Sequence, residues 1–337
     1  MTDDIGATVL ALDGGNSKTD GALVAADGSV LARLRGPGFR PHLGKDRALR
    51  GLATIARDLL DLAGLPRASM LSACLANSDL PEEDQEFAAW FSDQQLADRV
   101  HVTNDVFALL RSGTRERAAV TVVCGAGMNC VGIAPDGRTV RFLALGTFTG
   151  DWGGGGTLAE QAMFWAMRAE DGRGAPTALA DAVPRHFGHR TTQQVAVDLH
   201  VGAIDRSRLH ELVPVLFEVA DAGDAIALSV VRRQADEVIA FAMAALTRLE
   251  LLDTDTVVVL GGGVLAAGHR LLQEPITAFL ADHAPRATVT IPQITPIVGA
   301  VLIGLEQLAD GRPVSRRRET RIRSTLGEQP PAAAVGR

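Results

Sequence analysis

The chain has 337 residues, of which 47% are hydrophobic and 22% are charged, and it contains 35 glycines. This length exceeds what one hydrophobic core usually serves, and this composition excludes disordered and fibrous proteins. The net charge is −7, and because residues 311–337 hold seven arginines against two glutamates, residues 1–310 carry −12. Such an acidic body excludes a folded nucleic-acid-binding face, so we expect no nucleic-acid partner.

The N-terminus and the cysteines predict the compartment. The segment MTDDIGATV lacks the basic and apolar regions of a signal peptide, and no run of 18 apolar residues occurs. We therefore expect no membrane association. Cys74, Cys124 and Cys130 are odd in number and form no CxxC pair, which favours a reducing cytoplasm over a disulfide framework.

The first part of the chain predicts the element order βββαβαβα. Residues 8–12 and 20–34 give three strands, the last two joined by Asp27-Gly28, a strong hairpin signal. Apolar residues recur at helical spacing over 45–63. The remaining predicted elements are a strand over 70–76, a helix over 82–97, a strand over 99–103 and a helix that opens at residues 104–105.

The same pattern returns in residues 120–145, where an apolar strand, a glycine turn, a second strand, an Asp136-Gly137 hairpin and a third strand follow one another. An internal repeat explains this most simply and places a domain boundary near residues 112–119. Two similar α/β halves imply a ligand-binding cleft between them. The later predicted elements are helices over 157–169, 207–220 and 225–251, strands over 256–260 and 287–291, and a last helix over 297–308.

The first glycine turn spans residues 13–19, DGGNSKT. It is not a Walker A loop, because the G-x-x-x-x-G-K-[ST] pattern is absent and a strand follows. Glycine lets a phosphate approach the backbone amides, and Asp13 at the strand end suits a hydrated Mg²⁺. Taken alone, the turn is equally well explained as an ordinary glycine-rich β-turn. The candidate phosphate ligands are Gly14, Gly15, Asn16, Ser17, Lys18 and Thr19.

Two further glycine turns follow in the second half. The turn over 125–127 is the counterpart of the first, so the two together could hold a polyphosphate from both sides. The turn over 261–263 comes between an apolar strand and a helix, and such a turn can pack against adenine or ribose. Either motif alone is more often a common tight turn. The candidate nucleotide ligands are Gly125, Ala126, Gly127, Gly261, Gly262 and Gly263.

Asp105 follows Asn104 directly after a predicted strand. Both residue types are favoured at helix N-caps, which is the simpler interpretation of the pair. The functional alternative is that Asp105 is a general base, because a partly buried carboxylate can take a proton from an alcohol.

Asp151 precedes the glycine run 153–156, which ends at a predicted capping box over 157–160. Because four glycines are costly in backbone entropy, we expect this backbone to approach a ligand, with Asp151 accepting a hydrogen bond from a hydroxyl. His42 lies in a loop after the first sheet, where a surface role and a substrate contact are equally open.

The three glycine turns, with Asp105 between the first two, resemble the sugar kinase, DnaK-type chaperone and actin superfamily. Within it, the chain resembles the N-acetylglucosamine kinase and BadF/BadG/BcrA/BcrD ATPase family over residues 7–310. The segments that carry this resemblance are DGGNSKTD, ND at 104–105, GAGMN, GD at 150–151, VVLGGGV and PIVGAVLIGL at 296–305.

The resemblance implies an α/β fold of two ribonuclease H-like, actin-like ATPase lobes, each a mixed five-stranded sheet flanked by helices, with the cleft between them. The N-terminal lobe would comprise residues 1–117 with the closing helix 297–310, and the C-terminal lobe residues 118–296. We expect residues 311–337 to be a basic, disordered tail outside the fold. Truncation after residue 312 should then leave activity unchanged.

The resemblance also implies ATP-dependent phosphorylation of the 6-hydroxyl of N-acetylglucosamine or a related amino sugar or hexose, with ATP and Mg²⁺. Asp105 would remove the hydroxyl proton, and Asp13 would position Mg²⁺ through water. The expected partner is a small-molecule sugar, and a homodimer is one assembly that stays open. The implied substrate-binding residues are Arg40, His42, Asn104, Asn129 and Asp151.

The chain departs from the family pattern at several positions. Ala126 and Met128 stand where hydroxyl residues are usual, Trp152 stands where a glutamate is common, and Arg40 lies where the sugar loop usually has an asparagine. An arginine there favours an acidic or differently substituted sugar as an alternative acceptor. Two other functions stay open: an iron–sulfur activator ATPase of a radical dehydratase, and a non-catalytic sugar or nucleotide sensor.

Overall fold

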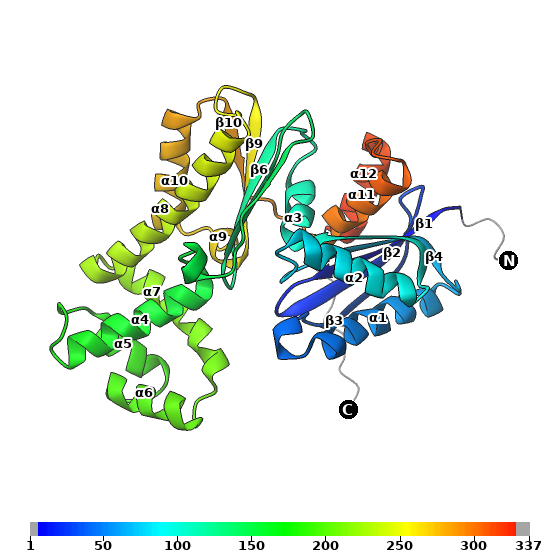
Figure 1. The fold of residues 1–337 in the computed structure, drawn as a ribbon. Helices are drawn as coiled ribbons and strands as arrows, with labels where there is room; N and C mark the ends of the chain where they lie inside the picture. Colours follow the sequence, from blue (N-terminus) through cyan, green and yellow to red (C-terminus); the bar gives the residue numbers. More distant parts are fainter. Residues whose placement is uncertain (1–5, 328–337) are drawn as a thin grey trace. The chain divides into compact units, whose positions relative to one another are not determined.

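The computed structural model describes residues 6–327, which divide into two compact α/β units (Figure 1). Unit 1 contains the chain up to Thr121 and again from Thr290, and unit 2 contains Val122–Val289. The chain therefore leaves unit 1 and returns to it. These divisions lie a few residues from the boundaries expected at 117/118 and 296/297.

Unit 1 contains a five-stranded mixed sheet with the strand order β3-β2-β1-β4-β5. Strand β1 pairs antiparallel with β2 and parallel with β4, so its carboxyl end lies beside the carboxyl end of β4. The three leading strands come from the predicted hairpins. The strands are β1 (Thr8–Gly14), β2 (Lys18–Ala25), β3 (Val30–Pro37), β4 (Ala68–Leu75) and β5 (Ala97–Asn104).

Alternate residues of β1 supply two different cores, as the period of two in a strand requires. Leu10 and Leu12 pack with α1 (Lys45–Leu62) and α2 (Pro81–Asp93) on one face of the sheet. Val9 and Ala11 pack on the other face with α3 (Asp105–Gly113), α11 (Ile297–Leu308) and α12 (Arg316–Leu326). Helices therefore cover both faces of the sheet (Figure 1).

Helix α12 contradicts the expected disordered tail. Its Ile322 and Leu326 are fully buried and belong to the same core as Val9 and Ala11. The arginine-rich sequence suggested a solvated segment, but two apolar side chains one helical turn apart are enough to anchor one face of this helix. Residues 328–337 of the predicted tail lie outside the described residues.

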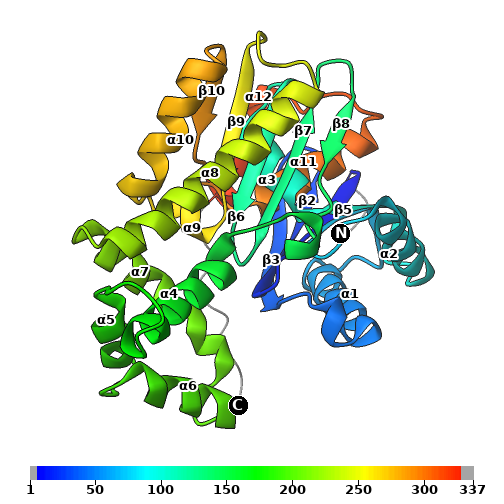
Figure 2. The same cartoon turned by 60° about the vertical axis from the view of Figure 1, so that its left-hand side comes forward.

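Unit 2 contains a second five-stranded sheet with the order β10-β9-β6-β7-β8 (Figure 2). Read from β8 to β10, the strands follow one another as they do in unit 1 from β3 to β5. Because both sheets begin with hairpin-linked strands followed by two crossover strands, the predicted repeat is confirmed. Its strands are β6 (Ala119–Cys124), β7 (Met128–Ile133), β8 (Thr139–Arg141), β9 (Thr256–Gly261) and β10 (Ala287–Thr290).

The long helix α8 lies against this sheet and contacts β7, and α10 packs on α8 (Figure 2). Helices α4 to α7 pack against one another as a helical insertion, in which α5 and α6 were not predicted. None of the helices in residues 6–327 has both the length and the apolar character needed to cross a bilayer. The helices are α4 (Gly154–Glu170), α5 (Leu179–His186), α6 (Thr192–Val201), α7 (Leu212–Asp221), α8 (Ala225–Arg248), α9 (Gly263–Ala266) and α10 (Arg270–His283).

Candidate functional site

Asp105 lies at the junction between β5 and α3, just beyond the carboxyl end of a parallel strand. Asn104 forms the N-cap of α3, because its side-chain Oδ1 accepts a hydrogen bond of 3.0 Å from the Val106 amide. The same side chain donates 3.0 Å bonds to the Ser78 carbonyl and to Asp79 Oδ1. Asn104, predicted to bind substrate, is instead buried, and its hydrogen bonds join the loop at residues 78–79 to the start of α3, where Asp105 lies.

The carboxyl group of Asp105 has an unusual acidity. Burial, followed by the nearby negative charge of Asp79, raises its pKa to about 7. A base whose pKa is close to neutral combines a large deprotonated fraction with a strong tendency to accept a proton. Asp79 was not predicted as a site residue, although it lies in the loop that follows the parallel strand β4.

Asp13 is the last side chain of β1 before the first glycine turn. Burial and the charges of Asp105 and Asp20 raise its pKa well above the ordinary value. A cation nearby would reverse this shift. Mg²⁺ is commonly held by one or two carboxylates together with water and substrate phosphates, so this single carboxylate at the strand end fits the expected ion. No cage of three or more potential ligands occurs among residues 6–327.

The first glycine turn is a tight hairpin in which the Gly15 amide donates a 3.0 Å bond to the Lys18 carbonyl. Lys18 reaches Asp20 at 3.2 Å, and its side chain remains 44% exposed. Thr19, predicted to bind phosphate, is fully buried, and its hydroxyl donates to the Pro37 carbonyl at 2.8 Å. Gly14 is also buried, where a Cβ would lie 2.8 Å from Leu75.

Asn16 is held from two directions. Its carbonyl accepts a 2.6 Å bond from Arg40 Nε, and its side-chain Oδ1 accepts a 2.9 Å bond from Asn77. The loop that carries Arg40 and His42 is thereby tied to the first glycine turn.

A cavity of about 590 Å³ opens beside this turn, entirely within unit 1. Its lining contains Ser17, Arg40 and Arg47 and no carboxylate, while Leu43 and Leu52 contribute apolar surface. Two guanidinium groups without a carboxylate favour a ligand that carries a negative charge.

In unit 2, the second and third glycine turns lie in direct contact. Gly262 has φ +85° and ψ 156°, a region open essentially to glycine alone. A Cβ at Gly262 would lie 2.5 Å from the carbonyl carbon of Cys124 and 2.7 Å from the Gly125 nitrogen. The structure therefore brings Gly125–Gly127 and Gly261–Gly263 together.

The glycine run 153–156 differs from the prediction at the start of the following helix. Helix α4 begins at Gly154 rather than at Thr157, so the expected capping box does not form. The Gly155 and Gly156 amides donate to the carbonyls of Gly125 and Ala126 at 2.7 and 2.9 Å. The close approach that the structure shows is to the second glycine turn.

Gln234 of α8 supports the start of α4 next to the second glycine turn, and this residue was not predicted from the sequence. Its fully buried side chain accepts a 2.8 Å bond from the Gly154 amide and lies 3.3 Å from the sulfur of Met128. A glutamine in the middle of an apolar helix stripe was the available signal. Met128, which departs from the family pattern, therefore packs against a residue that supports the turn.

Asp151 closes its own loop. Its Oδ2 accepts bonds from the Gly146 amide at 3.1 Å and the Thr149 hydroxyl at 2.6 Å. The neighbouring Trp152 stacks under the Arg233 guanidinium, whose carbon lies 4.2 Å from the ring centroid. The side-chain oxygen of Asn129 accepts a 2.7 Å bond from the Cys130 amide. These contacts fix both predicted sugar ligands on a defined backbone.

Gly262→Ala should destabilise the protein more than Gly268→Ala. Gly268 also has positive φ, +76°, but nothing lies within 4 Å of its Cβ position. We expect about 1 kcal/mol from the backbone at Gly268 and at least about 3 kcal/mol at Gly262, where strain and collision add. Urea unfolding measures both values, and equal losses would contradict the contact between the two turns.

Known proteins resemble this chain over most of its length. The sequence model of the BadF/BadG/BcrA/BcrD ATPase family matches residues 10–304. N-acetylmuramic acid/N-acetylglucosamine kinase from Clostridium acetobutylicum is 23% identical over 298 residues, which cover 88% of this chain and 97% of that protein. N-acetyl-D-glucosamine kinase from Dictyostelium discoideum is 23% identical over 312 residues, with the same coverage.

The fold is also found among solved structures. A protein from Chromobacterium violaceum assigned as an N-acetylglucosamine kinase superposes with a TM-score of 0.69 and 22% identity, covering 88% of this chain and 99% of that one. At this identity the likeness concerns the fold, and it agrees with the two five-stranded sheets described above.

Proposed function

Because the chain belongs to the BadF/BadG/BcrA/BcrD ATPase family, we propose that it is an ATP-dependent sugar kinase that phosphorylates the 6-hydroxyl of an amino sugar. The observation that carries the proposal is Asp105, a carboxylate whose pKa of about 7 suits a base for an alcohol at neutral pH. The kinase names of both curated relatives support the same class of reaction.

In the proposed reaction, the carboxylate of Asp105 accepts the proton of the acceptor hydroxyl. The hydroxyl oxygen forms a bond to the γ-phosphorus of ATP while the bond to the β,γ-bridging oxygen breaks, so the products are the sugar phosphate and ADP. Phosphoryl transfer depends mainly on positioning and charge stabilisation. Asn104 contributes by fixing the helix end that carries the base.

For the nucleotide, we assign the phosphates to Gly15, Asn16, Ser17 and Lys18 in unit 1, and to Gly125–Gly127 in unit 2. Gly261–Gly263 would pack against the adenosine. Asp13 would hold Mg²⁺ through water, and the ion would neutralise negative charge on the phosphates.

For the acceptor, we assign Arg40, His42, Asn129 and Asp151, with N-acetylglucosamine as the leading sugar. The cavity lined by Arg40 and Arg47 favours a second acceptor, an amino sugar with a carboxylate substituent. The muramic acid kinase name of one relative is consistent with that class.

Two other functions have less support. An iron–sulfur activator needs accessible thiolates, but all three cysteines are buried, and burial raises the pKa of Cys124 to about 12. A non-catalytic sensor has no need of a base whose acidity is tuned to neutral pH. The unpaired thiols are also consistent with a cytoplasmic location, which we propose as well.

An ADP-release assay with Mg-ATP and a sugar panel tests the proposal. N-acetylglucosamine and N-acetylmuramic acid should stimulate ADP release well above the rate without sugar. Arg47→Ala should lower kcat/KM for N-acetylmuramic acid between about tenfold and a hundredfold, because a hydrogen bond to a charged group is lost. The loss for N-acetylglucosamine should be much smaller.

The two parts of the proposal can fail separately. Absence of stimulation by every sugar would remove the kinase assignment. Stimulation with equal losses for both acceptors in Arg47→Ala would leave the kinase standing and remove the carboxylate site.

A further inference from the structure

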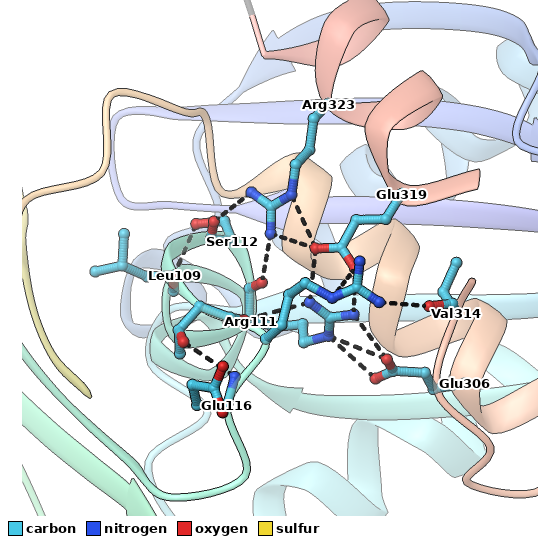
Figure 3. A network of polar contacts seen from close by, with 10 residues as sticks. Leu109, Arg111, Ser112, Glu116, Glu306, Val314, Glu319 and Arg323 are labelled. Carbon is cyan, nitrogen blue, oxygen red and sulfur yellow. Dashed lines mark hydrogen bonds and ion pairs between the residues drawn. The ribbon is translucent and has the colours of Figure 1, made fainter. Parts of the chain in front are cut away.

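A buried charge network joins the C-terminal helix α12 to the end of α3, the helix that begins at Asp105 (Figure 3). At its centre is Glu319, whose side chain is 1% exposed. Glu319 accepts from Arg111 of α3 at 3.1 Å and from Arg323 of its own helix at 2.7 Å. Arg115 reaches it at 3.2 Å.

The network also caps α3. Arg323 Nη1 donates a 2.6 Å bond to the Ser112 carbonyl, and its Nη2 lies 3.4 Å from the Arg111 carbonyl. The last carbonyls of a helix have no partner within it, and a cation there also complements the helix dipole. Arg111 is held in addition by Glu306 of α11 at 2.8 Å.

Helix α3 is held at two other places. At its beginning, Asn104 binds the 78–79 loop. In its middle, Gly299 of α11 approaches so closely that a Cβ there would lie 1.8 Å from the Ala108 carbonyl oxygen. A nine-residue helix is a short rigid rod of about 13 Å, so a displacement at its carboxyl end tilts its amino end as well.

From this geometry we propose that Glu319 and Arg323 are positioning residues, which act through α3 to hold Asp105 in its productive place. The inference rests on the proposed function, because it assigns these residues to the reaction in which Asp105 is the base. It gives the C-terminal helix a role in the reaction, although the helix contributes no group to the candidate site.

The test compares Glu319→Gln with Arg321→Ala. Arg321 also lies on α12, but its exposed side chain pairs with Asp27 of the β2–β3 hairpin at 2.8 Å and leaves α3 untouched. We expect Glu319→Gln to lower kcat between about tenfold and a hundredfold, with the KM for ATP within about twofold. Arg321→Ala should keep the wild-type kcat.

A double variant separates positioning from a general loss of structure. If Glu319 acts only by placing Asp105, it has nothing left to place once the base is removed. Glu319→Gln should then have little further effect on the residual rate of Asp105→Asn. An equal loss in both backgrounds, or a wild-type kcat in Glu319→Gln, would overturn the proposal. If Glu319→Gln does not fold, Arg323→Lys keeps the charge, loses the forked contact and is subject to the same criteria.

Hydrogen exchange gives a readout that does not depend on the sugar. Amides of residues 106–113 should exchange faster in Glu319→Gln and at the wild-type rate in Arg321→Ala. Unchanged exchange would overturn the positioning role even in an active kinase. Faster exchange in a protein that no sugar stimulates would instead remove the kinase assignment. The charge network between α12 and α3 would then be a structural feature only.

Discussion

Asp105→Asn should lower kcat by about two to four orders of magnitude and leave the dissociation constant for ATP within about twofold. The substitution keeps the shape of the side chain and removes only its ability to take a proton. Steady-state kinetics and calorimetric titration with an ATP analogue measure the two quantities. A variant with wild-type kcat would exclude Asp105 as the base.

The same substitution should increase stability above neutral pH. The pKa of Asp105 in the folded protein is about 7, whereas an unfolded aspartate titrates near 3.9. Between these values the folded state binds the proton more tightly, so its stability falls as pH rises and the carboxylate becomes charged. Asp105→Asn should therefore melt above the wild type at pH 8 and close to it at pH 4.

Asp79→Asn tests the cause of the raised pKa of Asp105. It removes the charge that contributes to the raised pKa of Asp105 and leaves the base in place. The wild-type kcat should rise with pH through about 7, and this rise should move to lower pH in Asp79→Asn. An unchanged profile would mean that another group controls the rate.

Truncation after Arg312 should severely destabilise unit 1. It removes the fully buried Ile322 and Leu326, each worth about 2 kcal/mol, and leaves Arg111 without Glu319. Arg111 keeps its ion pair with Glu306, so the lost charge contact adds little to this cost. A loss of about 4 kcal/mol is a large share of the stability of a typical domain, so we expect a much lower melting temperature by circular dichroism.

Truncation after Gly327 is the control, because it keeps α12. This shorter protein should melt at the wild-type temperature. Wild-type melting after truncation at Arg312 would show that the packing of α12 contributes little, contrary to the burial of its apolar face.

The parts of the fold that the sequence predicts well are those with local causes. Asp27-Gly28 and Asp136-Gly137 supply the positive φ that short hairpins need, so both sheets could be expected with their leading strands. The repeated order of strand, glycine turn and strand then indicated two similar halves. Asp105 was recognisable because it follows a strand directly.

The features that the sequence did not indicate have long-range causes. The partners of the α12 arginines include Asp27 and the carbonyl of Ser112, which are distant in sequence, so the segment resembled a solvated tail. The glycine run 153–156 indicated a close backbone approach but not the partner, which is the second glycine turn. Thr19 lies on β2, and its hydroxyl donates to the carbonyl of Pro37 on the neighbouring strand β3. The pairing of these two strands is needed to see this contact.

The most direct measurement is phosphorus and proton NMR of the products formed from Mg-ATP and N-acetylglucosamine. We expect ADP and a sugar phosphate in equal amounts, with the phosphorus coupled to the protons on carbon 6, and almost no product with Asp105→Asn. Inorganic phosphate without any sugar phosphate, formed at the same rate by both proteins, would contradict it.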